Sequence, residues 1–187
     1  MTKNINELIK NRFSPRAFSN KEVSEEQIKT LLKAATLAAS SYNEQPWRFI
    51  YAAKSNNTAF NKILDCVMEF NLPWAKNAAG FIICVVKDNL SLNDKPNSHA
   101  WHDMGLAIGN LSVQAQSMDI YLRQIGGFYA EKTKEVLNIP DGYTPISAIA
   151  LGYLGEITDL SEELQKRENT PKEFKPFEEL IFNGEWK

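Results

Sequence analysis

Residues 99–118, HAWHDMGLAIGNLSVQAQSM, form the stretch from which the fold can best be predicted. Leu106, Leu111 and Val113 stand there among small residues, a composition that suits a central helix packed closely on several sides. Each glycine costs a helix about 1 kcal/mol relative to alanine, but small residues let neighbouring elements approach. The small residues expected to do so are Gly105, Ala107, Gly109 and Ala115.

Strands are expected before and after this helix. Residues 80–86 form a short apolar run that is typical of a buried strand. Residues 47–53 (WRFIYAA) indicate another strand, followed by apolar residues at helical spacing between 60 and 68. Residues 146–154 alternate and predict a third strand. Because these elements do not follow a regular βαβ rhythm, the sequence predicts an α+β fold rather than a doubly wound α/β fold.

The first 27 residues contain two expected helix starts. Asn4 can cap a short helix, and Ser24 with Gln27 forms a capping box for a longer one. Between these helices, Pro15 removes an amide hydrogen and disfavours helical backbone at Ser14. We therefore expect an extended or turned segment around residues 12–18.

Length and composition favour one domain over residues 1–187, with 43% hydrophobic and 24% charged residues. The chain has 21 Lys and Arg against 23 Asp and Glu, spread along the sequence, so no strong field is available for a nucleic acid or an anionic membrane. No signal peptide and no stretch long enough to cross a bilayer are found. A cytoplasmic protein without nucleic-acid or membrane partners is expected.

Two groups of residues often linked to chemistry are interpreted as structural. Cys66, in a helical pattern, and Cys84, in a strand pattern, match no metal-ligand spacing and are expected to be ordinary buried thiols. His99 and His102, with Asp103, lie at a helix start, where a shared metal is conceivable. No third and fourth ligand cluster with them, so we expect no metal site.

Arg12, Ser14 and Arg16 are the first candidates for a binding site. In an extended segment, residues two apart point the same way, so two guanidinium groups and a hydroxyl would line one face. Such a face can hold a phosphate or another anion, because guanidinium is a planar donor that stays charged. The alternative is a surface turn with solvated arginines.

A second candidate is the segment 40–49, SSYNEQPWRF, between a helix and a strand. Pro46 fixes a turn there, and a plain helix end followed by a strand entry explains part of the composition. Asn43 and Gln45 each present a donor and an acceptor, the combination that recognises the edge of a heterocycle. In a third candidate, 123–128 (RQIGGF), adjacent glycines would let backbone amides approach a flat ligand, the alternative being a helix C-cap.

Taken together, these segments resemble the nitroreductase family of FMN-dependent, NAD(P)H-oxidising enzymes. The resemblance implies an α+β fold with a central, mostly antiparallel sheet flanked by helices, and a C-terminal tail extended over the partner subunit of a homodimer. It is carried by RFSPRAF (12–18), ASSYNEQPWRF (39–49), HDMGLAIGNLSVQAQ (102–116), QIGGF (124–128) and ALGYLGE (150–156).

The resemblance assigns roles at one end of the flavin. It implies that Arg12 and Ser14 contact the phosphate and ribityl chain, with Phe13 between them, and that Arg16 lies near the N1 and O2 edge of the ring. A fixed cation there would stabilise the negative charge of reduced flavin. In the tail, Lys172 matches one of two phosphate-binding cations and Phe174 replaces the other, with Lys166, Arg167 and Lys175 as possible substitutes.

The ring and the partner subunit account for the other implied contacts. The family's serine and asparagine loop would contact the cofactor of the other subunit, and Ala39 stands where many members have proline. Ile125 and Gly126 would lie beside the ring, a backbone N–H facing N5, with Gly127 as permissive backbone. In this chain Ser40, Ser41 and Asn43 belong to the serine and asparagine loop, and Gln45 and Asn71 are the remaining cofactor-binding candidates.

The implied reaction is the NAD(P)H-dependent reduction of a small electrophile, such as a nitroaromatic or a quinone, by ping-pong hydride transfer through flavin N5. The chain lacks a GxGxxG fingerprint for a separate dinucleotide domain, and no side chain of the motifs is an obvious proton donor. Alternatives are a flavin-dependent dehalogenase, a flavin-destroying enzyme, a flavin-binding module with little turnover, or an unrelated α+β domain.

Overall fold

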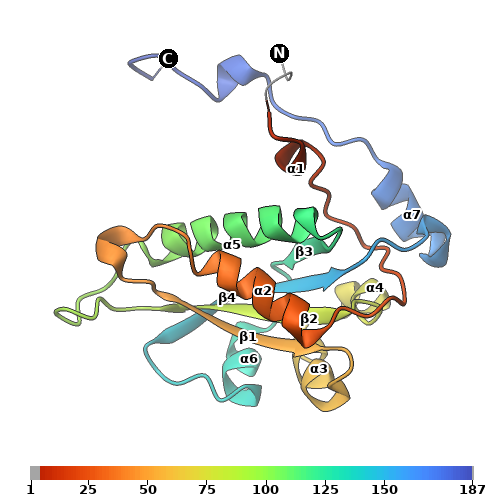
Figure 1. Ribbon diagram of the computed structural model, residues 1–187, viewed down its shortest axis with the longest axis horizontal. Coiled ribbons are helices and arrows are strands. Elements are labelled where there is room, and N and C mark those ends of the chain that lie inside the picture. Colours follow the sequence, from red (N-terminus) through yellow and green to blue (C-terminus); the bar gives the residue numbers. More distant parts are fainter. Residues whose placement is uncertain (1–4, 187) are drawn as a thin grey trace.

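The structure, a computed structural model, describes residues 5–186 and contains a four-stranded sheet with helices on both faces (Figure 1). The strands are β1 (Trp47–Ala53), β2 (Gly80–Lys87), β3 (Tyr121–Ile125) and β4 (Tyr143–Gly152). The helices are α1 (Glu7–Lys10), α2 (Glu25–Ala35), α3 (Asn57–Leu64), α4 (Leu72–Ala75), α5 (Ala100–Ser117), α6 (Ala130–Val136) and α7 (Glu162–Asn169). Short 3-10 turns cover Ser41–Asn43, Glu69–Asn71, Ile157–Asp159 and Phe177–Glu179.

All neighbouring strands of the sheet are antiparallel, in the order β1-β2-β4-β3. The apolar run of β2 lies next to the centre of the sheet and is buried on both faces from Gly80 to Val86. This confirms the predicted α+β class with an antiparallel sheet.

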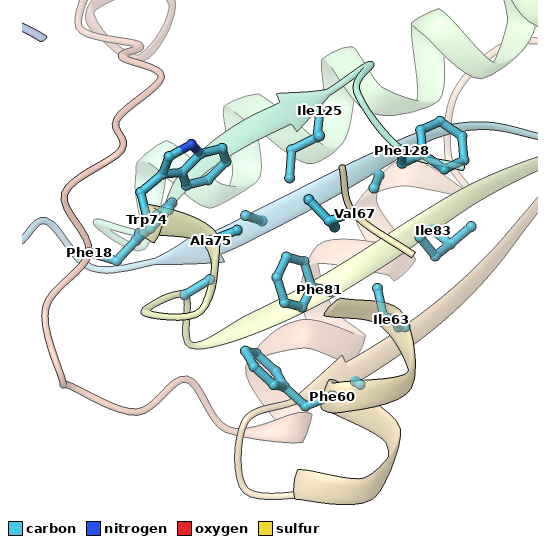
Figure 2. Packing of buried hydrophobic residues seen from close by; sticks show 14 of the residues in the cluster. Phe18, Phe60, Ile63, Val67, Trp74, Ala75, Phe81, Ile83, Ile125 and Phe128 are labelled. Atoms are coloured by element: carbon cyan, nitrogen blue, oxygen red, sulfur yellow. The ribbon is translucent and has the colours of Figure 1, made fainter. Parts of the chain in front are cut away.

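Each face of the sheet has its own core. On one face, α2 and α5 pack through Ile28, Leu31, Met104 and Leu111. On the other, α3, α4 and α6 cover a cluster with several aromatic rings, shown in Figure 2. In that cluster the Phe60 and Phe81 ring centroids are 4.8 Å apart. Because the sheet is covered on both faces, the loops and helix ends at its edges are left to form sites.

The helix starts were only partly predicted. The Ser24 and Gln27 capping box is present, with both reciprocal hydrogen bonds. Asn4 lies outside the described residues, and the side chain of Asn6 caps α1 by accepting from the Leu8 amide at 2.9 Å.

Three further expectations differ from the structure. The helix expected between residues 60 and 68 ends at Leu64, and Val67 instead forms a β-bridge with Phe128. Cys66 therefore lies after that helix. A strand was missed, since β3 carries the polar side chains of Arg123 and Gln124 and has no long apolar run.

The long helix α5 packs with one side on the sheet and on α2, and helix α1 approaches its other side across a hollow. Gly105 and Gly109 lie on its exposed side, and a Cβ built at either position would meet no other atom within 4 Å. Leu106 and Val113 are exposed on the same helix. The prediction of close packing on several sides is thus wrong for the single chain.

The C-terminal tail leaves the body of the molecule after α7 (Figure 1). It exposes a series of large apolar side chains, and the Phe182 and Trp186 rings contact each other at 4.6 Å between centroids. No helix in residues 5–186 is both long and apolar enough to cross a membrane. The exposed apolar residues of the tail are Phe174, Phe177, Leu180, Ile181 and Trp186.

Candidate functional site

The extended segment 12–18 is held against helix α7 by one carboxylate. The Arg16 backbone amide donates to Glu168 Oε1 at 2.7 Å, and the Arg16 Nη1 atom donates to Glu168 Oε2 at 2.9 Å. The Glu168 side chain is 2% exposed. Two charge-assisted hydrogen bonds to one buried carboxylate fix both the backbone and the guanidinium group.

A second guanidinium reaches the same segment from strand β3. Arg123 Nη1 donates to the carbonyl oxygen of Ser14 at 2.8 Å, and the guanidinium carbon lies 5.1 Å from the centroid of the Trp74 ring. Burial and the neighbouring Arg16 charge lower the pKa of Arg123 to about 10, whereas Glu168 acts in the opposite direction. This arginine therefore lies in a partly desolvated, positively charged place.

Lys172 adds a further cation from the tail. Its Nζ atom lies 4.7 Å from the centroid of the Phe13 ring. Burial lowers the pKa of Lys172, and the charges of Arg12 and Arg123 lower it further. We call Arg12, Arg16, Arg123 and Lys172 the basic cluster.

Arg12 is the member of the basic cluster that borders a hollow on the α5 side of the sheet. A cavity of about 120 Å³ lies beside Arg12, and a second hollow of about 420 Å³ shares Arg12, Ser112 and Gln124 with it. The Arg12 guanidinium, the Ser112 hydroxyl and the Gln124 carboxamide therefore border the same open space. The cavity is lined by Arg12, Phe13, Ser14, Ser112, Gln116, Ile120, Leu122 and Gln124.

Residues 39–45 form a strained loop, called here the serine loop, at the other end of the molecule (Figure 1). Tyr42, Asn43 and Gln45 have φ angles of 52°, 55° and 48°, in the left-handed region that non-glycine residues rarely adopt. The Ser41 amide donates to Asp103 Oδ2 at 3.0 Å, and the Gln45 amide donates to Ser40 Oγ at 3.0 Å.

The serine loop presents its side chains to solvent. Tyr42 is 95% exposed, and Ala39, Asn43 and Gln45 are exposed as well. In Figure 1 the loop and helix α7 lie at opposite ends of the molecule. The serine loop and the basic cluster of one chain therefore cannot hold the same small ligand.

The Gly126–Gly127 turn is fastened to the loop after α3. Both the Met68 amide, at 3.0 Å, and Asn71 Nδ2, at 3.3 Å, donate to the Gly127 carbonyl oxygen. A Cβ at Gly127 would lie 2.5 Å from the Phe70 ring, so this close approach requires glycine. At Gly126 a Cβ would meet nothing within 4 Å, so its backbone borders open space.

The structure brings together only part of the predicted set. Arg12, Phe13, Ser14, Arg16 and Lys172 lie at the basic cluster. Asn71 lies at the glycine turn, which follows Ile125 at the end of β3. The serine-loop residues Ala39, Ser40, Ser41, Asn43 and Gln45 lie elsewhere.

Sequence reasoning missed three buried or half-buried groups. Arg123 is the first residue of the candidate segment 123–128, and its charge three positions before Gly126 was the available signal, but no role was predicted for it. Glu168 gave no signal within a charged stretch. Asp103 was considered only together with His99 and His102, for a metal site at a helix start. It binds the Ser41 amide, and its Oδ1 atom lies 3.1 Å from His102 Nδ1.

The cysteine interpretation is confirmed. Cys66 and Cys84 are free and buried, and burial raises the pKa of both, that of Cys84 to about 12. Within residues 5–186, no three His, Cys, Asp or Glu side chains converge in a way that could hold a metal ion.

Comparisons with known proteins find relatives that are named as FMN or flavin oxidoreductases. A solved structure described as an oxidoreductase containing FMN is 31% identical, covers 100% of this chain and 95% of its own, and superposes with a TM-score of 0.93. The FMN reductase (NADPH) of Bacillus subtilis is 28% identical over 88% of this chain and 71% of its own. The major NAD(P)H-flavin oxidoreductase of Aliivibrio fischeri is 32% identical over 50% of this chain and 44% of its own.

The family comparison covers most of the chain. The sequence pattern of the nitroreductase family matches residues 9–153, which include the segment 12–18, the serine loop, helix α5 and the glycine turn. This chain therefore belongs to the nitroreductase family.

Proposed function

We propose that this protein is an FMN-dependent oxidoreductase that uses NAD(P)H to reduce small electrophiles such as nitroaromatics or quinones. The observation that carries the proposal is the basic cluster, whose Arg12 lines an open hollow. Among residues 5–186, Arg12, Arg123 and Lys172 form no ion pair with a carboxylate. A phosphate ester, which carries about two negative charges at neutral pH, fits this donor set.

Different residues of the chain would bind different parts of the cofactor. Arg12, Ser14 and Lys172 would hold the phosphate and ribityl end, and Arg16, fixed by Glu168, would stand at the N1 and O2 edge of the ring. Gly126 would offer backbone to the ring. The flavin supplies the two-electron chemistry when bound, and the protein supplies binding, orientation and charge.

We also propose that residues 1–187 form one domain and that two copies form a cytoplasmic homodimer. Two observations support the dimer: the exposed apolar side of α5, with Leu106 and Val113, and the apolar tail that extends from the body. Large exposed apolar patches of this kind mark interaction surfaces. The serine loop would then reach the cofactor of the partner, which explains its distance from its own basic cluster.

The central test is the visible absorption spectrum of the purified protein, followed by addition of FMN. We expect a yellow protein, or one that turns yellow with FMN, whose flavin is bleached by NADH or NADPH within the turnover range of enzymes, about 1 to 1000 per second. Anaerobic product analysis with a nitroaromatic or a quinone then tests the acceptor. A protein that binds no FMN would refute the proposal, and bleaching far slower than this range would indicate a flavin-binding module.

Two variants and a mass measurement test the assignments. Arg16→Ala should weaken flavin binding or slow flavin reduction, whereas His102→Ala, at an exposed side chain, should change neither. Analytical ultracentrifugation should give the mass of two chains. Normal flavin content and reduction in the Arg16 variant would remove Arg16 from the site, and a monomeric flavoprotein would refute the dimer.

A further inference from the structure

Arg123 is half-buried and uses little of its hydrogen-bonding capacity. Its guanidinium carries five N–H donors, and within residues 5–186 the bond to the Ser14 carbonyl oxygen is the one hydrogen bond that it donates. It forms no ion pair there, and its second contact is the face of Trp74. Within residues 5–186, the remaining donors therefore have no hydrogen-bond partner in the protein.

The charges around Arg123 do not cancel. Glu168 is tied to Arg16 through both carboxylate oxygens, so it neutralises one of the four cations. Burial and mutual repulsion disfavour the charged forms of Arg123 and Lys172 in the ligand-free protein. Such a gathering of cations is unfavourable unless an anion joins it, and groups perturbed in this way cluster at binding sites.

The tail offers no better second partner for a phosphate next to Lys172. Arg167 Nη2 is paired with Glu163 Oε1 at 2.6 Å on the exposed side of α7. Phe174 is 86% exposed and carries no charge. Lys166 and Lys175 are also exposed. Arg123, by contrast, already contacts the backbone of the segment that carries Arg12 and Ser14.

We infer that Arg123 is a phosphate-binding residue of the cofactor site and acts together with Arg12 and Lys172. The inference rests on the proposed FMN function and adds a residue that comes from the sheet rather than from either end of the chain. A guanidinium can hold two oxygens of a phosphate through its planar fork. Its contacts with Ser14 and Trp74 hold it in place before binding, which reduces the entropy lost when the anion arrives.

Comparing FMN with riboflavin tests this inference directly, because riboflavin has the same ring and lacks the phosphate. Both dissociation constants are measured by flavin fluorescence for the flavin-free wild-type protein and for Arg123→Met, which keeps an unbranched side chain without charge. We expect FMN to bind about 10- to 100-fold more weakly to the variant, the effect of one lost charge-assisted hydrogen bond, and riboflavin to bind unchanged. The Arg123→Lys variant should lose less FMN affinity, because lysine keeps the positive charge but lacks the planar pair of N–H donors.

Arg167→Met is the matched control, since it also removes one positive charge, at an exposed position of α7. It should leave both affinities unchanged. If Arg123→Met weakens FMN and riboflavin equally, or weakens neither, Arg123 is a structural residue and the inference is wrong. If Arg123→Met does not fold, Arg123→Lys decides by the same comparison. Failure of the wild type to bind either flavin would instead refute the proposed function.

Discussion

Arg16 and Glu168, which lie 152 positions apart in the sequence, form the tightest link between the two ends of the chain. One carboxylate accepts from the Arg16 amide at 2.7 Å and from the Arg16 guanidinium at 2.9 Å. The side chains of Arg16 and Glu168 are 19% and 2% exposed. Helix α7 therefore positions the segment 12–18 and, within residues 5–186, supplies the one carboxylate that forms an ion pair with the basic cluster.

We expect Glu168→Gln to destabilise the flavin-free protein by about 1 to 3 kcal/mol, because Arg16 loses its counter-charge among three other cations in a partly buried place. Urea denaturation measures this change. Glu163→Gln is the control, since it breaks an exposed ion pair with Arg167 on the same helix and should cost less than about 1 kcal/mol. Equal stability of the two variants would show that the Arg16–Glu168 pair contributes no more than a surface pair.

Asp103→Ala should loosen the serine loop. The carboxylate accepts from the Ser41 amide at 3.0 Å and so helps to hold a backbone with three unfavourable φ angles. We expect a loss of about 1 to 3 kcal/mol and faster amide hydrogen exchange in residues 40–45. His102→Ala is the control, because the exposed imidazole touches the same carboxylate but not the loop. Unchanged exchange in the Asp103 variant would show that the loop holds its conformation without this contact.

The two neighbouring glycines should respond differently to alanine. Gly127→Ala places a Cβ 2.5 Å from the Phe70 ring and 2.9 Å from Asn71 Nδ2, so we expect the loop after α3 to shift, at a cost of about 1 to 3 kcal/mol. A Cβ at Gly126 would meet no atom within 4 Å, so Gly126→Ala should change the free energy of unfolding by less than about 0.5 kcal/mol. If the flavin ring lies beside Gly126 as proposed, the same substitution should nevertheless weaken FMN binding. Thermal melts and FMN titrations separate the two effects.

A loss of stability in Gly126→Ala as large as in Gly127→Ala would contradict the packing described here. Unchanged FMN affinity in Gly126→Ala would instead move the ring away from this turn and leave the packing intact.

The sequence predicted best where a local pattern and the tertiary contacts agree. The apolar run of β2 is buried on both faces, and the capping box at Ser24 depends only on residues within one turn. Strand β3 was missed because it lies at the edge of the sheet, pairs with β4 alone and carries Arg123 and Gln124. Periodicity is not informative for so short a strand.

In the candidate site, too, residues marked by a local pattern could be predicted, whereas residues placed by distant contacts could not. Arg12, Ser14 and Arg16 could be found because an extended segment places alternate residues on one face. Glu168 could not, because its partner Arg16 lies on a distant segment and nothing in a charged helix distinguishes one glutamate from its neighbours. The open side of α5 shows a further limit, since small residues permit close packing, yet a Cβ at Gly105 or Gly109 would meet no atom of this chain within 4 Å.

The lowered pKa values of Arg123 and Lys172 give a pH dependence whose sign can be worked out. The unfolded chain binds these protons more tightly than the folded, ligand-free chain, since burial and the charges of Arg12 and Arg16 disfavour the charged forms, opposed by Glu168. Between the folded pKa, about 10 for Arg123, and the ordinary value of 12.5, the contribution of that group to stability therefore rises with pH. A bound phosphate needs the charged forms of Arg123 and Lys172. The affinity of the protein for the phosphate must therefore fall as the pH rises.

We therefore expect the ratio of the riboflavin to the FMN dissociation constant to be constant near neutral pH and to fall as the pH rises toward about 10, the folded pKa of Arg123. The phosphate keeps its two charges throughout, because its second pKa lies at about 6. Ionisation of the flavin ring affects both ligands and cancels in the ratio. Arg167→Met should follow the wild type, whereas Arg123→Met should start from a lower ratio and keep only the part of the fall that comes from Lys172. A wild-type ratio that stays constant up to about pH 10.5 would show that neither Arg123 nor Lys172 loses its charge beside the phosphate in this range.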